Sequence, residues 1–349
     1  MKTQDFFFDV PPEYIAQFPA ETRGKSRLLV LERHTGAYCH HQIADLPVLI
    51  EPGSLLVFND SRVRPSRLLG VDSAQRPVEL LLLEQIHDDG ITNCWKALVK
   101  QRRRHTGKQL FFPEGLCAEI IGLEDEWCRV VFDRKLEDQW LERCAHIPLP
   151  PYIKRPATYE DSNRYQTIYA EKTGSAAAPT AGLHFTSELM DAFAARNIQT
   201  AFLTLHVGLG TFLPVRVNNI EDHKMHKEHF NISESTAEQF EAAKREKRPV
   251  VAVGTTTLRA LESAWNGTRL QRGDNSTSIF IYGDYHFTTA DMLFTNFHTP
   301  ESTLLMLAAS FCGAFCGAEA GRTMILNAYQ TAQAAHYRFF SYGDAMLIR

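Results

Sequence analysis

The sequence predicts an α/β protein: a main mixed α/β domain that carries a small inserted antiparallel β-barrel domain. Two stretches of the 349-residue chain indicate this. From about residue 163 onward, apolar runs of strand length alternate with runs of helix length, which is typical of an α/β domain. From about residue 78 to residue 133, short strand-like runs instead follow one another closely, which is typical of a small barrel or sandwich.

The first half of the chain supplies the predicted domain boundaries. Strand-like runs at 26–32 and 53–60 belong to the main domain, and a helix is predicted over 136–145. The proline-rich run 147–156 is stiff, extended chain that returns from the insertion. We therefore predict a main domain at residues 1–65 plus 149–349 and an inserted barrel domain at residues 66–148. The predicted barrel strands are 78–84, 93–100, 108–112, 116–121 and 127–133.

The second half of the chain supplies the alternating elements. A helix over 233–248 is predicted to begin with Ser235 and Glu238 as a capping box. The apolar run 249–254 is a strand, and the helix 255–265 follows it at once. Further strands are predicted at 200–207, 277–282 and 291–297, and further helices at 302–311 and 324–337.

Composition narrows the possible classes of protein. A net charge of −4, from 37 basic and 41 acidic side chains, argues against a surface that binds nucleic acid all over, but it allows a local basic patch. No apolar run approaches the roughly 20 residues of a membrane helix. The N-terminus lacks the pattern of a secretory signal, and the seven cysteines form no disulfide framework. We expect a cytoplasmic protein without membrane contact.

Residues 174–186, with the sequence GSAAAPTAGLHFT, form an unusual run of small side chains. Such residues let backbone N–H groups approach a ligand closely, and Thr180 and Gly182 are candidates for this contact. The run then presents His184 and Phe185, and Thr186 is placed to cap a following helix. The alternative is a tight loop that only packs beneath the domain.

Three further runs place polar groups directly after predicted strands, where α/β domains commonly bind ligands. His206 ends one strand and is followed by Gly208, Gly210 and Arg216. Thr255 and Thr256 begin a helix, whose N-terminus favours a carboxylate, although simple helix capping is the alternative. The third strand ends in Asn296 and His298, and a C-terminal run brings Arg338, Tyr342 and Asp344 among aromatic residues.

Two clusters suggest metal or RNA binding. His223, His226 and His229 recur every three residues, but they lack the i,i+4 spacing of zinc proteases on a helix. The densest basic cluster lies between two predicted barrel strands, where a loop would suit a phosphate backbone or merely be solvated. Its cationic residues are Lys100, Arg102, Arg103, Arg104 and Lys108.

Taken together, these runs resemble one family, the S-adenosylmethionine:tRNA ribosyltransferase-isomerases of queuosine biosynthesis. The resemblance extends nearly from end to end and is weakest in the inserted barrel. Residues 280–287, FIYGDYHF, depart from the family pattern at an expected Pro-Gly turn. The matching runs include FFDVPPEYIAQFPAETRGKSRLLVL, GSLLVFNDSRVRPSRLLG, PLPPYIKR, GSAAAPTAGLHFT, TLHVGLGTFLPVRV, VVAVGTTTLRALE, TNFHTPESTLLML and YRFFSYGDAMLI.

The resemblance implies a tRNA-modifying transferase. The enzyme would move the ribosyl part of S-adenosylmethionine to 7-aminomethyl-7-deazaguanine at the wobble position of tRNAs with a GUN anticodon. The sugar would be isomerised, adenine and methionine would leave, and epoxyqueuosine-tRNA would form. S-adenosylmethionine is consumed as a substrate, so no separate cofactor and no metal are expected, and a monomer is expected.

The residues expected to carry this reaction fall into three groups. His206, His184 and His298 are the candidate acid and base, because imidazole titrates near neutral pH. The basic cluster of the barrel is the candidate tRNA contact. The candidate substrate-binding residues are Tyr165, Thr180, Gly182, Phe185, Gly208, Gly210, Arg216, Thr255, Thr256, Arg259, Asn296, Arg338 and Asp344.

Two other classes of function stay open on the sequence. A metal-dependent hydrolase would use the run from His223 to His229. A non-catalytic tRNA-binding protein would use the barrel and its basic cluster, and its binding would depend steeply on salt.

Overall fold

The computed structural model describes residues 1–86, 92–208, 210 and 215–349, and these divide into two compact units. The main unit comprises Met1–Arg62, Pro151–Arg155 and Gln166–Arg349, and the barrel unit comprises Val63–Pro150 and Pro156–Tyr165. The architecture confirms the predicted fold class, because the main unit holds a large mixed sheet and the barrel unit holds a closed antiparallel barrel.

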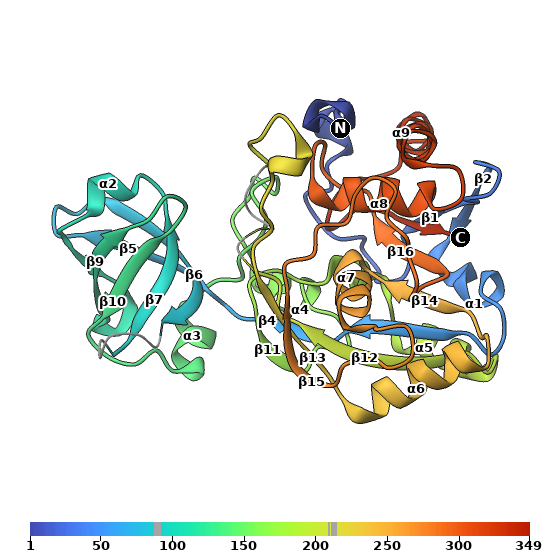
Figure 1. The fold of residues 1–349 in the computed structure, drawn as a ribbon. Helices are drawn as coiled ribbons and strands as arrows, with labels where there is room; N and C mark the ends of the chain where they lie inside the picture. The colour runs from blue at the N-terminus through green and yellow to red at the C-terminus, as the bar shows by residue number, and fades with distance from the viewer. Residues whose placement is uncertain (87–91, 209, 211–214) are drawn as a thin grey trace. The chain divides into compact units, whose positions relative to one another are not determined.

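The barrel unit closes six antiparallel strands in the order β10-β7-β6-β5-β8-β9 (Figure 1). Alternate apolar side chains such as Leu80, Ala97 and Val130 point inward and fill its core, as expected for a small barrel. Trp140 of helix α3 packs on the same core. The strands are β5 (Arg67–Asp72), β6 (Pro77–Ile86), β7 (Cys94–Val99), β8 (Gln109–Phe111), β9 (Cys117–Leu123) and β10 (Cys128–Phe132).

The main unit contains a sheet in the order β15-β13-β12-β3-β14-β16-β17-β1-β2. Strands β12, β3, β14 and β16 run parallel to one another, and β17 runs antiparallel to β16. The strands are β1 (Arg27–Leu31), β2 (Tyr38–Gln42), β3 (Leu55–Asn59), β12 (Gln199–Leu205), β13 (Glu228–Ile232), β14 (Val250–Val253), β15 (Gly273–Thr277), β16 (Met292–Asn296) and β17 (Ala345–Ile348). Strands β4 (Ser61–Val63) and β11 (Lys172–Ser175) form a separate two-stranded sheet.

The central strands are almost wholly apolar because helices cover both faces of the sheet. In β3, Leu56 and Phe58 pack on the side of α5, whereas Leu55 and Val57 pack on the side of α6 and α7 (Figure 1). The helices are α1 (Leu46–Leu49), α2 (Arg102–His105), α3 (Asp138–Cys144), α4 (Tyr159–Arg164), α5 (Ser187–Ala195), α6 (Glu234–Arg245), α7 (Thr255–Ala264), α8 (Thr303–Gly313) and α9 (Ala318–Ala334). Short 3-10 turns occur at Thr3–Phe6, Pro12–Tyr14, Ile43–Asp45, Pro113–Gly115, Thr180–His184 and Ile220–Asp222.

Two predictions about elements of the main unit were wrong. Helix α6 is capped by Ser233, whose side chain accepts from the N–H of Thr236 at 3.2 Å, and not by the predicted Ser235–Glu238 box. Strand β15 ends at Thr277, where the predicted strand 277–282 was to begin, because Thr277 pairs with the first residue of its partner, Glu228. Beyond that point the chain has no strand to pair with in β13, and Ile279 and Phe280 pack on the core instead.

Among the described residues, no single helix is both long and apolar enough to cross a membrane; α8 and α9 satisfy length and composition only as a pair, which is bent by 114°.

Candidate active site

Most of the predicted site residues of the main unit meet at one edge of the sheet, which we call the carboxyl edge. It is defined by the last residues of the parallel strands β12, β3, β14 and β16. His206, Gly254 and His298 follow three of these strands. Asn296 pairs with Ala345, so Asp344 lies at the same edge although it precedes its own strand. Figure 1 shows this edge where β12, β14 and β16 end.

His184 and Asn296, which are far apart in the sequence, are joined at this edge. The amide nitrogen of Asn296 lies 3.0 Å from Nε2 of His184 and 3.5 Å from the backbone oxygen of Asp344. Since an amide nitrogen only donates, Nε2 of His184 accepts this bond, and the ring proton belongs on Nδ1. The amide oxygen of Asn296 is buried and has no partner among the described residues.

His184 is a neutral group at physiological pH. Burial lowers its pKa to about 3, and the positive charges of Arg338 and Arg23 act in the same direction. Its ring therefore cannot supply a stored proton near pH 7, but it can accept or relay a hydrogen bond. The same charges show that the surroundings of His184 are electropositive.

His298 is held just as firmly. Its Nε2 lies 2.8 Å from the hydroxyl of Thr295, and its backbone N–H donates to the hydroxyl of Tyr329 at 2.9 Å. Burial lowers the pKa of His298 to about 4. These contacts describe a buried, neutral imidazole that is anchored between a strand and helix α9.

His206 differs from the other two histidines because it is only half-buried. Its backbone N–H donates to the carbonyl of His229 at 2.9 Å, which fixes the end of β12. Gly174 lies against the imidazole so closely that a Cβ there would be 2.8 Å from Cε1 of His206. The small-residue run thus positions this ring, which of the three predicted histidines is the most accessible to a substrate.

A buried ion pair lies beside His206. Glu228 and Arg259 meet at 2.5 Å, and their side chains are only 7% and 6% exposed. The second oxygen of Glu228 accepts from the N–H of Gly208 at 3.2 Å, so the pair also holds the start of the glycine loop. Nη2 of Arg259 is buried and has no partner among the described residues. Sequence patterns gave no sign of this pair, whose members are on β13 and α7.

The start of helix α7 is built by Gly254. Its φ of 93° suits glycine, and it serves as the N-cap in place of a side chain. Thr255 is buried, and the hydroxyl of Thr256 accepts from the amide of Asn59 at 3.3 Å. The two threonines therefore do not act as the cap, and the first N–H groups of α7 face the carboxyl edge.

Asp60 is a candidate that the sequence analysis missed. It follows β3 at the carboxyl edge, and its carboxylate accepts from the hydroxyl of Thr204 at 2.6 Å. Burial raises the pKa of the Asp60 carboxyl, and the Thr204 hydrogen bond partly opposes this. The residues NDS at 59–61 could have indicated it, because they too place polar groups directly after an apolar strand.

Some residues of the small-residue run 174–186 are buried in the core, and others are partly exposed. Gly182 is buried, and a Cβ there would lie 2.2 Å from the hydroxyl of Tyr169. Thr180 is half-buried, and Thr186 caps α5 as predicted, accepting from Leu189 at 3.2 Å. Phe185 is only 1% exposed.

The ring of Phe185 has a core position rather than an open face. It packs edge to face on Phe58 and Phe294, with centroids 4.9 and 5.3 Å away. A base cannot stack on this ring without displacing the core. Tyr165 is fully buried as well and belongs to the barrel unit.

Asp344 and Arg338 form the next part of the edge. The carboxylate of Asp344 accepts from the backbone N–H groups of Arg27 at 2.9 Å and Arg338 at 2.8 Å. The guanidinium of Arg338 donates to the carbonyl of Phe18 at 3.3 Å. Asp344 therefore shapes the backbone, whereas Arg338 extends toward the surface.

The end of the glycine loop and the histidine run contribute less to the described part of the site. Gly210 and Arg216 are exposed, and residues 209 and 211–214 of the same run lie outside the described residues. The histidine run does not form a helix: His223 follows a 3-10 turn, and His229 is exposed on β13. No group of three metal-ligating side chains is found within residues 1–86, 92–208, 210 and 215–349.

The basic cluster of the barrel forms the short helix α2 rather than a loop. Arg102 donates to the carbonyls of Trp127 and Asp125 at 3.2 and 2.8 Å, so it holds a neighbouring turn. Lys108 donates to the carbonyl of Arg104 at 2.8 Å, and Lys100 pairs with Glu79 at 2.7 Å. Arg103 and Arg104 are exposed and present their charge to solvent.

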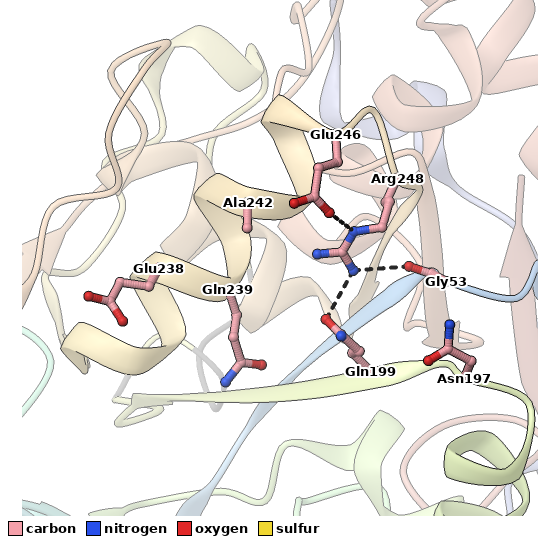
Figure 2. A pocket seen from close by; sticks show the side chains of 8 residues that line it. All are labelled: Gly53, Asn197, Gln199, Glu238, Gln239, Ala242, Glu246 and Arg248. Carbon is pink, nitrogen blue, oxygen red and sulfur yellow. Dashed lines mark hydrogen bonds and ion pairs between the residues drawn. The ribbon is translucent and has the colours of Figure 1, made fainter.

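A hollow of about 480 Å³ lies in the main unit (Figure 2). Gly53, Asn197 and Gln199 precede or begin β3 and β12, so the hollow is at the opposite edge of the sheet. Arg248 lies across it and donates to the carbonyl of Gly53 and the side-chain oxygen of Gln199, both at 3.0 Å. None of the predicted catalytic histidines lines it.

Comparison with known proteins gives a consistent result. A model of the queuosine biosynthesis protein family matches residues 3–348. The chain is similar to the S-adenosylmethionine:tRNA ribosyltransferase-isomerases of Treponema denticola, at 49% identity, and of Clostridioides difficile, at 44%, with both chains of each pair covered completely. The crystal structure of S-adenosylmethionine tRNA ribosyltransferase from Thermotoga maritima matches at 31% identity with a TM-score of 0.55, covering 99% of this chain and 100% of that one.

Proposed function

The chain belongs to the S-adenosylmethionine:tRNA ribosyltransferase-isomerase family of queuosine biosynthesis, and from that premise we propose its substrates and the roles of its residues. The enzyme transfers and isomerises the ribosyl moiety of S-adenosylmethionine onto 7-aminomethyl-7-deazaguanine. The target base is at the wobble position of tRNAs with a GUN anticodon. Adenine and methionine leave, and epoxyqueuosine-tRNA is the product.

The observation that carries this proposal is the set of polar groups at the carboxyl edge. A half-buried imidazole, a neutral buried imidazole and two buried polar atoms that have no partner within the described part of the chain are all contributed by the main unit. Buried polar groups normally have partners, so such atoms are suited to bind a polar substrate. The oxygen of Asn296 would accept from an N–H of a base, and Nη2 of Arg259 would donate to the methionyl carboxylate.

The chemistry requires a base near the carbon next to the sulfonium and an acid near the departing adenine. We assign proton transfer to His206, because its half-buried ring is more exposed than those of His184 and His298. His184 and His298 are neutral and anchored, so they orient groups by hydrogen bonding. The N-terminus of α7 at Thr255 and Thr256 adds favourable potential for the carboxylate.

The other candidate residues of the main unit are proposed to contact the substrates. Thr180, Gly182, Gly208, Gly210 and Arg216 line or approach the site through backbone and surface positions, and Arg338 and Asp344 frame the target base. Phe185 supports this region from the core.

The barrel is proposed to bind the tRNA backbone. Arg103 and Arg104 of α2 are exposed, and Lys100 is 77% exposed beside Glu79, so all three can reach phosphates. Arg102 and Lys108 stabilise the loop ends that present them. We propose residues 66–148 as the RNA-binding domain of a cytoplasmic, monomeric enzyme.

The test combines S-adenosylmethionine with a GUN-anticodon tRNA that carries 7-aminomethyl-7-deazaguanine, in the presence of a chelator. Epoxyqueuosine in the digested RNA, with an equal amount of free adenine, supports the proposal. His206→Ala should lower turnover at least about 100-fold, as loss of a general acid or base does, with tRNA affinity unchanged. Equal loss of both would refute the catalytic role.

A further inference from the structure

Phe18 is an exposed aromatic residue on a rigid support near the carboxyl edge. The residue is 59% exposed, as Phe7 and Phe315 of the main unit also are to a similar degree. The preceding residue, Gln17, is fixed by hydrogen bonds: its side chain donates to the carbonyl of Tyr152 at 3.0 Å and accepts from the N–H of Lys154 at 2.8 Å. The ring is therefore held in place while much of its surface faces solvent.

Arg155 covers one side of this ring. Its guanidinium carbon lies 4.1 Å from the ring centroid of Phe18, and its Nε donates to the carbonyl of Gln17 at 2.9 Å. A guanidinium stacked on one face leaves the other face of the ring open. Exposed rings of this kind, backed by arginine, are the platforms on which proteins stack nucleic-acid bases.

The platform is connected to the candidate catalytic groups. Arg338 donates to the carbonyl of Phe18 at 3.3 Å, and its backbone N–H donates to Asp344. The carbonyl of Asp344 accepts from Asn296, which bonds His184. Arg338 and Arg23 make the surroundings of His184 positive, Arg155 lies against the ring of Phe18, and its neighbour Lys154 is exposed. A negatively charged backbone is thus attracted to the place where the ring is open.

We propose that Phe18, backed by Arg155, stacks a nucleobase of the tRNA anticodon loop other than the base that is modified. This inference rests on the proposed function, since it assumes tRNA as the substrate. Phe18 acts as an RNA-binding residue and takes no part in proton transfer. Stacking of one base fixes the loop, so that the neighbouring wobble base is presented to the carboxyl edge.

The test compares Phe18→Leu, Phe18→Trp and a matched control, Phe315→Leu. Phe315 is also exposed, at 58%, and Arg33 lies 4.8 Å from its ring. Arg33, however, follows the end of β1 that is farther from the carboxyl edge. The full-length proteins are titrated with an anticodon stem-loop that carries 2-aminopurine beside the wobble position, and fluorescence quenching reports stacking. Steady-state KM values for tRNA and S-adenosylmethionine are measured in parallel.

Phe18→Leu should weaken stem-loop binding about 5- to 100-fold and abolish the quenching, as expected for loss of one base stack. KM for S-adenosylmethionine should stay within about twofold of the wild-type value, since this variant leaves the carboxyl edge intact. Phe18→Trp should retain binding, and Phe315→Leu should behave as wild type. If Phe18→Leu binds as tightly as Phe315→Leu, or loses only kcat, the proposal is wrong. Wild-type protein that binds and quenches without forming product would refute the proposed function but support the platform.

Discussion

Glu228→Gln is the substitution whose effect follows most directly from the structure. It removes one charge from the buried pair with Arg259 and changes the side-chain shape very little. Both partners are more than nine-tenths buried and meet at 2.5 Å. The variant leaves the guanidinium of Arg259 with its charge uncompensated in a site that water barely reaches.

The expected loss of unfolding free energy is large, although the substitution only replaces one carboxylate oxygen by an amide nitrogen. Breaking a buried ion pair by removing one partner costs about 3–5 kcal/mol. The new amide still accepts one hydrogen bond, so we expect the lower end, about 3 kcal/mol. With an m-value of about 3 kcal/mol per M, the urea midpoint of the main unit should fall by about 1 M.

The control is the same substitution in an exposed pair, Glu234→Gln. Glu234 lies 2.8 Å from Arg272, but its side chain is 66% exposed, so its loss should cost about 1 kcal/mol or less. Unfolding is followed by circular dichroism, and hydrogen exchange of peptides from α7 assigns the change to the main unit. A Glu228→Gln midpoint shift no larger than that of Glu234→Gln would refute the reasoning.

Three further predictions concern pH, packing and RNA affinity. The folded-state pKa values of His184 and His298, about 3 and 4, are below the ordinary 6.5, so the unfolded chain takes up these protons first and stability should fall as pH is lowered from about 6.5 toward 4. The loss should approach about 1.4 kcal/mol per pH unit for each histidine, and urea midpoints at pH 7 and pH 5 should show a smaller difference for His298→Gln than for wild type. Gly182→Ala should destabilise by about 1–3 kcal/mol, because its Cβ would lie 2.2 Å from the Tyr169 hydroxyl; an unchanged melting temperature would contradict the close approach. Arg103→Gln should weaken tRNA binding and reduce the slope of log K against log salt by about 1, and an unchanged slope would show that this side chain contacts no phosphate.

Local sequence patterns were sufficient where each element is determined by its own side chains. The strands at 27–31, 55–59 and 250–253 were predicted because they are buried on both faces and must be apolar throughout. Thr186 was predicted as a cap because capping involves residues only three positions apart. The same reasoning failed at α6, where Ser233 and Ser235 are equally good caps by sequence, and Ser233 caps the helix that buries Phe240 in the core.

Only the tertiary structure decided which distant groups meet. Asn296 bonds His184 across 112 positions, and Arg259 pairs with Glu228 from a different element. Both contacts depend on tertiary packing, because one joins the 3-10 turn Thr180–His184 to β16 and the other joins β13 to α7. The sequence by itself determined most of the elements, the fold class with its barrel, and the family. Whether a ring such as Phe185 is core and a ring such as Phe18 is open depends on long-range packing, which no local pattern of residues encodes.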